Sequence, residues 1–210
     1  MELVSLTPEG KIALALTHGK HTYNELKVET GLSDRWLTVK LKKLESEGVV
    51  RKSGRWYGLA GKLDLSAYEL SLYLGFQAKR MAGELAKLSF VETIVLFGGV
   101  AQKRASELSD LDMIIVVKEP IEKVKRRIIS EISRLELKYH VMIEPLILTE
   151  EDFLDNVYLQ EGGIVYGVAE GFVVLVDKTS KLAGILYNRV EEIKRSHEYL
   201  REARIWLKIK

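Results

Sequence analysis

Residues 91–117 read VETIVLFGGVAQKRASELSDLDMIIVV, and this stretch decides the fold. It begins and ends with β-branched and apolar runs, each of which predicts a buried strand, and the pair Gly98-Gly99 allows a sharp turn after the first. Asp110 and Asp112 stand two residues apart at the start of the second run, so a strand would point both carboxylates to one face. Neighbouring carboxylates repel each other unless a cation lies between them, and Mg²⁺ prefers oxygen ligands. A glycine turn beside an acidic pair indicates phosphoryl or nucleotidyl transfer.

The order of these features also matches a known pattern. Leu96-Phe97-Gly98-Gly99, Ala101 and Ser109-Asp110-Leu111-Asp112 fall without a gap on the pattern Leu-Phe-Gly-Ser, Ala-Arg-Gly, Ser-Asp-hydrophobic-Asp. The stretch therefore resembles the DNA polymerase beta-like nucleotidyltransferase superfamily, in particular its minimal nucleotidyltransferase type. Gly99 replaces the usual Ser, whose hydroxyl would bond a phosphate oxygen, and Gln102-Lys103 replaces Arg-Gly. Lys103 or Arg104 is the candidate replacement for the lost phosphate contact.

The resemblance implies a nucleoside triphosphate substrate and two Mg²⁺ or Mn²⁺ ions. Glu144, a lone acid in the apolar run 138–148, matches the place of the family's third carboxylate; the alternative is an edge-strand Glu that points to water. His140 has the same parity in this predicted strand, and we expect it to be structural. The candidate catalytic and metal-binding residues are Asp110, Asp112 and Glu144, and the candidate nucleotide-binding residues are Gly98, Gly99, Lys103, Arg104 and Ser109.

The first 62 residues predict a winged helix-turn-helix, because three helical patterns precede two short strands around a basic turn. Eleven basic residues against seven acidic ones give this part a net charge of about +4. Trp36 and Val39, on the face that would meet a DNA groove, instead indicate an apolar surface for protein. We expect this face to be at least partly covered, by the transferase domain or by a second copy in a homodimer. The candidate residues for binding DNA or RNA are Arg35, Lys40, Arg51, Lys52 and Arg55.

The predicted fold class is α+β, with a winged helix followed by a mixed sheet and flanking helices. The expected parts are the winged helix at 1–62, a connecting helix at 63–89, the nucleotidyltransferase domain at 90–178 and a C-terminal helix at 179–210. Asp64 or Ser66 is expected to cap the connecting helix.

Composition limits the class of protein. Among the 210 residues, 47% are hydrophobic and 30% are charged, as in a globular protein with a core. The absence of cysteine excludes disulfides and thiolate metal sites, and the scatter of the four histidines along the sequence argues against zinc. Residues 1–5 show no signal pattern and no apolar run approaches about 18 residues, so we expect a cytoplasmic protein without a membrane segment. Abundant Lys, Arg, Glu, Ile and Val suit an archaeal or thermophilic source.

Two functions compete at this level. The first is a Mg²⁺-dependent nucleotidyltransferase that moves a nucleoside monophosphate to an unidentified acceptor, with the winged helix for regulation or targeting. The second is a DNA-binding transcriptional regulator whose nucleotidyltransferase-like domain senses a nucleotide without catalysis. The second is motivated by Gly99 and by the altered loop after it.

Overall fold

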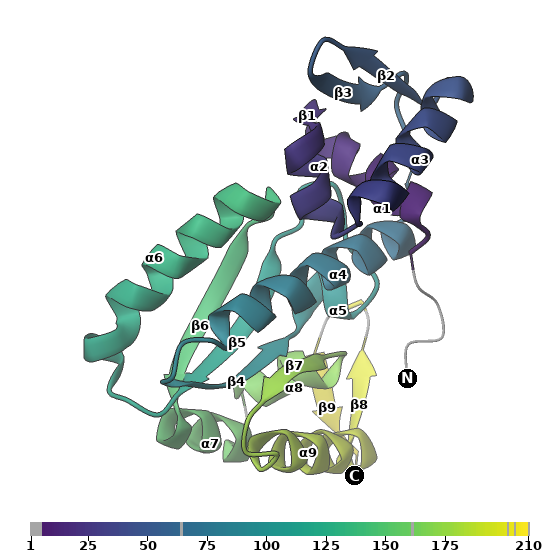
Figure 1. The fold of residues 1–210 in the computed structure, drawn as a ribbon. Coiled ribbons are helices and arrows are strands. Elements are labelled where there is room, and N and C mark those ends of the chain that lie inside the picture. The colour runs from purple at the N-terminus through teal and green to yellow at the C-terminus, as the bar shows by residue number, and fades with distance from the viewer. Residues whose placement is uncertain (1–5, 64, 161, 201, 204, 210) are drawn as a thin grey trace.

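A computed structural model describes residues 6–63, 65–160, 162–200, 202–203 and 205–209 (Figure 1). The described residues up to 59, here called the N-terminal module, form three helices and a small antiparallel sheet of order β1-β3-β2. The elements of the module are α1 (Pro8–Ala15), a 3₁₀ turn (Leu16–His18), β1 (His21–Thr22), α2 (Tyr23–Thr30), α3 (Asp34–Ser46), β2 (Val50–Ser53) and β3 (Trp56–Leu59). Thr22 and Glu25 form a capping box at the start of α2.

The central sheet is mixed, as predicted. Its strands are β4 (Val91–Leu96), β5 (Leu111–Val117), β6 (Ile143–Thr149) and β7 (Val173–Asp177), in the order β6-β5-β4-β7. Strands β5 and β6 are parallel, whereas β4 is antiparallel to both of its neighbours. The long helix between β5 and β6 makes the crossover that parallel strands need. The α+β class is therefore confirmed.

Helices cover both faces of this sheet (Figure 1). On one face, α4 (Ala67–Leu85) and α6 (Ile121–Tyr139) pack on alternate strand residues such as Leu96, Met113 and Ile115. On the other face, α7 (Glu150–Tyr158), α8 (Ile164–Ala169) and α9 (Leu182–Ser196) pack on Val95, Ile114 and their neighbours. The alternation explains why the strands are apolar on both sides. Ser66 caps α4, and the other cap candidate, Asp64, lies outside the described residues.

Two sequence-based boundaries are wrong. The strand expected from residue 138 begins only at Ile143, because the amphipathic period of α6 continues to the buried Tyr139. His140 ends that helix with a left-handed φ of 55°, so its supposed parity with Glu144 along a strand does not exist.

The helix expected over 179–210 ends at Ser196. It is followed by the hairpin β8 (His197–Leu200) and β9 (Ile205–Lys208). Here the sequence changes to strand-like alternation, and the indole N–H of Trp206 donates to the carbonyl of Tyr166 at 2.8 Å. This tertiary contact favours the hairpin over a longer helix.

The apolar face of α3 is not covered by the nucleotidyltransferase domain. Trp36 and Val39 are each 53% exposed, and the buried side of α3 is formed instead by Leu37, Leu41 and Leu44. The expectation that the nucleotidyltransferase domain covers this face is therefore wrong, and its covering by a second copy of the chain stays a prediction. Of the helices in the described ranges, none is both long enough and apolar enough to span a membrane.

Candidate active site

Three carboxylates gather at one end of the sheet. One oxygen from each of Asp110, Asp112 and Glu144 lies within 4.8 Å of the others. Asp112 is the direct register partner of Glu144 across the parallel pair β5 and β6, and Asp110 immediately precedes β5. Asp110 and Asp112 are half-buried, and Glu144 is exposed. Strand β6 lies at the edge of the sheet, yet its Glu144 carboxylate turns toward the aspartate pair.

Repulsion within this group affects its ionisation. Burial, together with the charges of Asp110 and Glu144, raises the pKa of Asp112, with the backbone N–H of Gly99 acting in the opposite direction. A divalent cation would offset the repulsion, and three carboxylate groups are the oxygen donors that Mg²⁺ and Mn²⁺ accept. The donor set therefore fits the metal that the sequence predicted.

Gly98 holds the turn against the acidic pair. Its φ is 67°, and a Cβ placed on it would lie 1.8 Å from Oδ2 of Asp112. The backbone N–H of Phe97 donates to the Asp112 carbonyl at 3.0 Å, which fixes the two segments side by side. Gly98 is thus required both for the left-handed conformation and for the space beside the carboxylate. The one-turn helix α5 (Gly98–Ala101) begins at this residue.

The two departures from the family pattern have different structural consequences. A Cβ on Gly99 would meet only the Arg104 carbonyl, at 3.9 Å, so there is room for the Ser of the pattern. Lys103 occupies the place of the pattern's Gly and has a φ of 62°. The backbone therefore keeps a left-handed conformation there that favours Gly, although the side chain has changed.

Other predicted nucleotide-binding residues take part in the structure of the loop. The Arg104 guanidinium pairs with the Glu170 carboxylate at 2.9 Å and also donates to the Gln102 side chain. Ser109 accepts a hydrogen bond from the Ser106 backbone N–H at 2.8 Å. Lys103 is exposed. The Glu170 contact could not be inferred from the sequence, because 66 positions separate it from Arg104.

A cavity of about 720 Å³ lies beside Asp110, between the N-terminal module and the loop that precedes β5. Its lining includes His18, Leu65, Tyr73, Leu108, Asp110 and Met142. Leu108 is 96% exposed and Met142 is 64% exposed, so large apolar side chains stand in water next to the acidic group. Sequence reasoning missed both, because isolated apolar residues in loops carry no periodic signal.

The predicted nucleic-acid residues are separated by the fold. Arg51, Lys52 and Arg55 are exposed together on the β2–β3 hairpin, and Arg35 is exposed on α3. Lys40 instead pairs with Glu9 at 2.8 Å. The hydrogen bond from Lys40, with a further one from Lys43, lowers the pKa of Glu9 to about 2. Lys40 therefore has a role inside the module.

Comparison with known proteins identifies relatives of this chain. Residues 79–170 match the family described as Polymerase beta, Nucleotidyltransferase. A predicted protein adenylyltransferase of Methanocaldococcus jannaschii is 39% identical over 71 residues, which are 32% of this chain and 72% of the relative.

Solved structures show weaker likeness. A predicted nucleotidyltransferase from Sulfolobus solfataricus is 20% identical with a TM-score of 0.32, over 48% of this chain and 94% of that chain. A complex of a tri-AMPylated Shewanella oneidensis HEPN toxin with MNT antitoxin contains a chain that is 10% identical with a TM-score of 0.35. That match covers 58% of this chain and 87% of the other. The assignment to a family rests on the sequence matches alone.

Proposed function

Because the chain belongs to the polymerase beta-like nucleotidyltransferase family, we propose that it transfers a nucleoside monophosphate from a nucleoside triphosphate to an acceptor hydroxyl. The observation that carries this proposal is the meeting of Asp110, Asp112 and Glu144 within 4.8 Å at the ends of two parallel strands. The acceptor oxygen forms a bond to the α-phosphorus, and the bond to pyrophosphate breaks.

Each residue of the site has a role in this reaction. Asp110, Asp112 and Glu144 would hold divalent ions, which when bound lower the pKa of the attacking hydroxyl and offset the charge on the leaving pyrophosphate. Glu144, the exposed member, also helps to accept the acceptor's proton. The backbone at Gly98 and Gly99 lies against the phosphates, and the exposed Lys103 offsets their charge.

The acceptor in this proposal is a protein, and the nucleotide is ATP. The M. jannaschii relative is named for protein adenylylation. In this chain, the exposed Leu108 and Met142 beside the cavity offer the apolar contact that a protein surface can bury.

The proposal is tested by the position of the label in ATP. Incubation with α-labelled ATP, Mg²⁺ or Mn²⁺ and an extract of the source cells is expected to label a protein band. γ-Labelled ATP should give no such band, because the γ-phosphate leaves with pyrophosphate. Excess EDTA should abolish the labelling. Labelling from the γ-position, or labelling unaffected by EDTA, would contradict nucleotidyl transfer.

Leu108 and Met142 should control acceptor recognition. We expect Leu108→Asp with Met142→Asp to raise the KM for the protein acceptor at least about tenfold, because burying each apolar side chain contributes about 1.5–3 kcal/mol. The affinity for ATP should not change. Leu137→Asp is the matched control, since Leu137 is 79% exposed on α6 outside the cavity lining. An equal rise of this KM in the control, or no rise in the double variant, would show that Leu108 and Met142 do not contact the acceptor.

A second proposal concerns the N-terminal module. We interpret 1–62 as a winged helix-turn-helix, joined through 63–89 to a nucleotidyltransferase domain at 90–178, with 179–210 as a C-terminal extension. The exposed cations of the β2–β3 hairpin favour contact with DNA or RNA, which would target the enzyme or, in the alternative function, make the chain a nucleotide-sensing regulator. The exposed face at Trp36 and Val39 is the proposed contact in a homodimer.

Nucleic-acid binding by the hairpin should depend on salt and not on sequence. Arg51→Ala with Lys52→Ala is expected to weaken binding uniformly across sequences and to reduce the slope of log affinity against log salt by about 2. Lys123→Ala with Lys125→Ala on α6 also removes two exposed charges and serves as the control. Gel shifts over a salt series measure both. An unchanged slope in the hairpin variant would contradict the proposal that this hairpin binds nucleic acid.

A further inference from the structure

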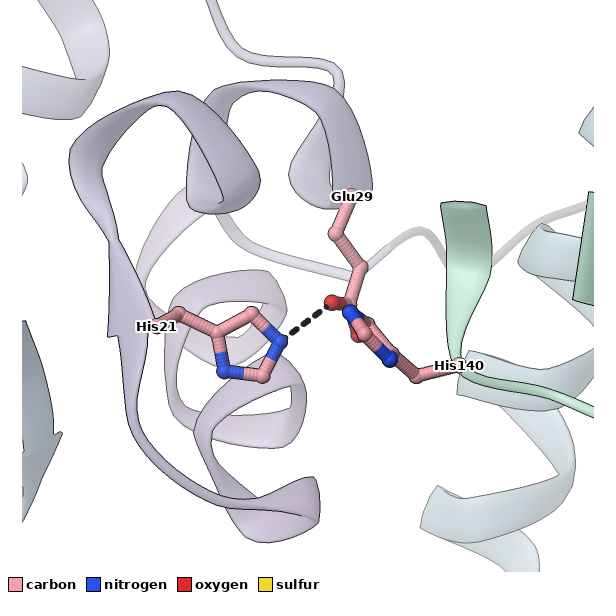
Figure 2. A group of neighbouring side chains, drawn as sticks. All are labelled: His21, Glu29 and His140. Carbon is pink, nitrogen blue, oxygen red and sulfur yellow. Dashed lines mark ion pairs between the residues drawn. The ribbon is translucent and has the colours of Figure 1, made fainter. Parts of the chain in front are cut away.

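Three of the chain's four histidines meet where the N-terminal module packs on the nucleotidyltransferase domain. His21, Glu29 and His140 each offer one ligand atom within 4.8 Å of the others, and both rings lie against the Glu29 carboxylate (Figure 2). Nδ1 of His18 is 3.7 Å from Oε1 of Glu29. The histidines are scattered along the sequence, which argued against zinc, but three of them are neighbours in the folded chain.

The tautomer of His21 directs a lone pair into the cluster. Its Nδ1 is 3.0 Å from the Gly19 carbonyl, and a carbonyl only accepts, so Nδ1 carries the hydrogen. Its Nε2 lies 2.7 Å from Oε2 of Glu29. Both of these atoms are buried, and neither has a partner of hydrogen-bond geometry among the described residues. Two lone pairs cannot face each other at this distance, so these atoms either share a proton or bind a metal ion beside them.

Glu29 is held as a metal-ligating carboxylate usually is. It is fully buried, and the Tyr73 hydroxyl donates to its Oε1, whereas its Oε2 faces Nε2 of His21. The Gln77 amide and the Arg80 guanidinium bond its backbone carbonyl, so α4 fixes the end of α2. Hydrogen bonds from outer groups to a ligating carboxylate, and from a ligating His to a carbonyl, are typical of metal sites.

We propose that His21 Nε2, Glu29 Oε2 and His140 bind a zinc ion, with solvent or His18 in the fourth position. Two imidazoles and one carboxylate suit zinc, at bond lengths of about 2.0–2.1 Å, better than they suit Mg²⁺. His140 is exposed at the end of α6, its ring 5.1 Å edge-on from that of His21, so its side chain has freedom to close on the ion.

The competing interpretation is a proton in place of the metal. Burial lowers the pKa of His21, but the adjacent Glu29 carboxylate outweighs it and raises that pKa. A buried imidazolium–carboxylate pair would need only His21 and Glu29. Such a pair would not need His140, so replacement of His140 distinguishes the two interpretations.

A zinc ion here would join the two parts of the chain. His21 belongs to β1 and Glu29 to α2, whereas His140 lies between α6 and β6, the strand that carries Glu144. His18 and His140 also line the cavity beside Asp110. The ion would therefore fix the N-terminal module against the wall of the proposed acceptor site. This structural role does not depend on the proposed transfer reaction.

Cobalt provides the test with the full chain. After dialysis against EDTA, stoichiometric Co²⁺ is expected to give the visible d–d absorption of a low-coordinate nitrogen and oxygen site, and Zn²⁺ should displace it. Zn²⁺ should raise the melting temperature, because it binds the folded state. His140→Ala should lower Zn²⁺ affinity at least about 100-fold, and Tyr73→Phe about tenfold without loss of the absorption. His140 is exposed, so its replacement should leave the fold intact.

Two controls locate the ion. His197→Ala changes the one histidine outside the cluster, and Asp110→Asn with Asp112→Asn removes the acidic site; both should keep the cobalt absorption. If wild-type protein gives no such absorption, or if His140→Ala binds Zn²⁺ as tightly as wild type, the cluster is a proton-bridged pair and the proposal is wrong. Loss of the absorption in the aspartate variant would place the metal elsewhere and would also overturn it.

Discussion

Replacement of Asp110 and Asp112 together by asparagine is expected to lower kcat/KM for nucleotidyl transfer at least about a thousand-fold. The two aspartates supply most of the charge that would hold divalent ions against the nucleotide phosphates. The carboxylate that remains in the variant, Glu144, is exposed on an edge strand. The loss should appear as an absent acceptor band with α-labelled ATP. Asp155→Asn with Glu151→Gln, at exposed positions of α7, removes two charges away from the site and should leave labelling unchanged.

The same variant separates function from stability. Because the pKa of Asp112 is raised in the folded protein, its ionised form is disfavoured there, and stability falls as the pH rises through that pKa. At neutral pH in EDTA, the double asparagine variant should therefore melt no lower than wild type, while Mg²⁺ should cease to raise its melting temperature. Lost labelling together with a lower melting temperature would indicate unfolding instead of a missing metal site.

The acidic pair was predictable from sequence because the relation between its members is local. In a strand, i and i+2 share a face, so the Asp-x-Asp spacing already places both carboxylates together. Glu144 was assigned from its match to the place of the family's third carboxylate, and the structure pairs it with Asp112 across the parallel strands β5 and β6. The cap at Ser66 was equally accessible, because its side chain bonds a backbone N–H three residues ahead.

Features made by contacts between distant segments were not predictable in this way. The histidine cluster joins His21 to His140, and nothing in the neighbourhood of either residue indicates the other. The C-terminal hairpin depends on the docking of Trp206 against Tyr166, which outweighs the helical pattern before it. Trp36 and Val39 show a different limit, because they were expected to be covered by the nucleotidyltransferase domain or by a second copy, and within the single chain they are half exposed. The apolar character of a side chain does not by itself show which surface covers it.

Gly98→Ala should damage the site more than its change of one methyl group suggests. The left-handed φ of 67° costs a non-glycine residue about 1–2 kcal/mol of stability. The added Cβ would also lie 1.8 Å from Oδ2 of Asp112, so the carboxylate must rotate away. That movement costs little stability but displaces a proposed metal ligand. We therefore expect a modest fall in melting temperature with a loss of transfer of about 100-fold or more.

Gly99→Ala is the matched control for this prediction. The same methyl group meets only the Arg104 carbonyl, at 3.9 Å, and Gly99 is not among the residues with positive φ. It should fold and transfer like wild type, and Gly99→Ser, which restores the hydroxyl of the family pattern, should lower the KM for ATP. Equal losses at both glycines would mean that the whole turn is sensitive to any side chain. Full activity in Gly98→Ala would show that Asp112 can hold the metal from a different rotamer, and that the contact with Gly98 does not position it.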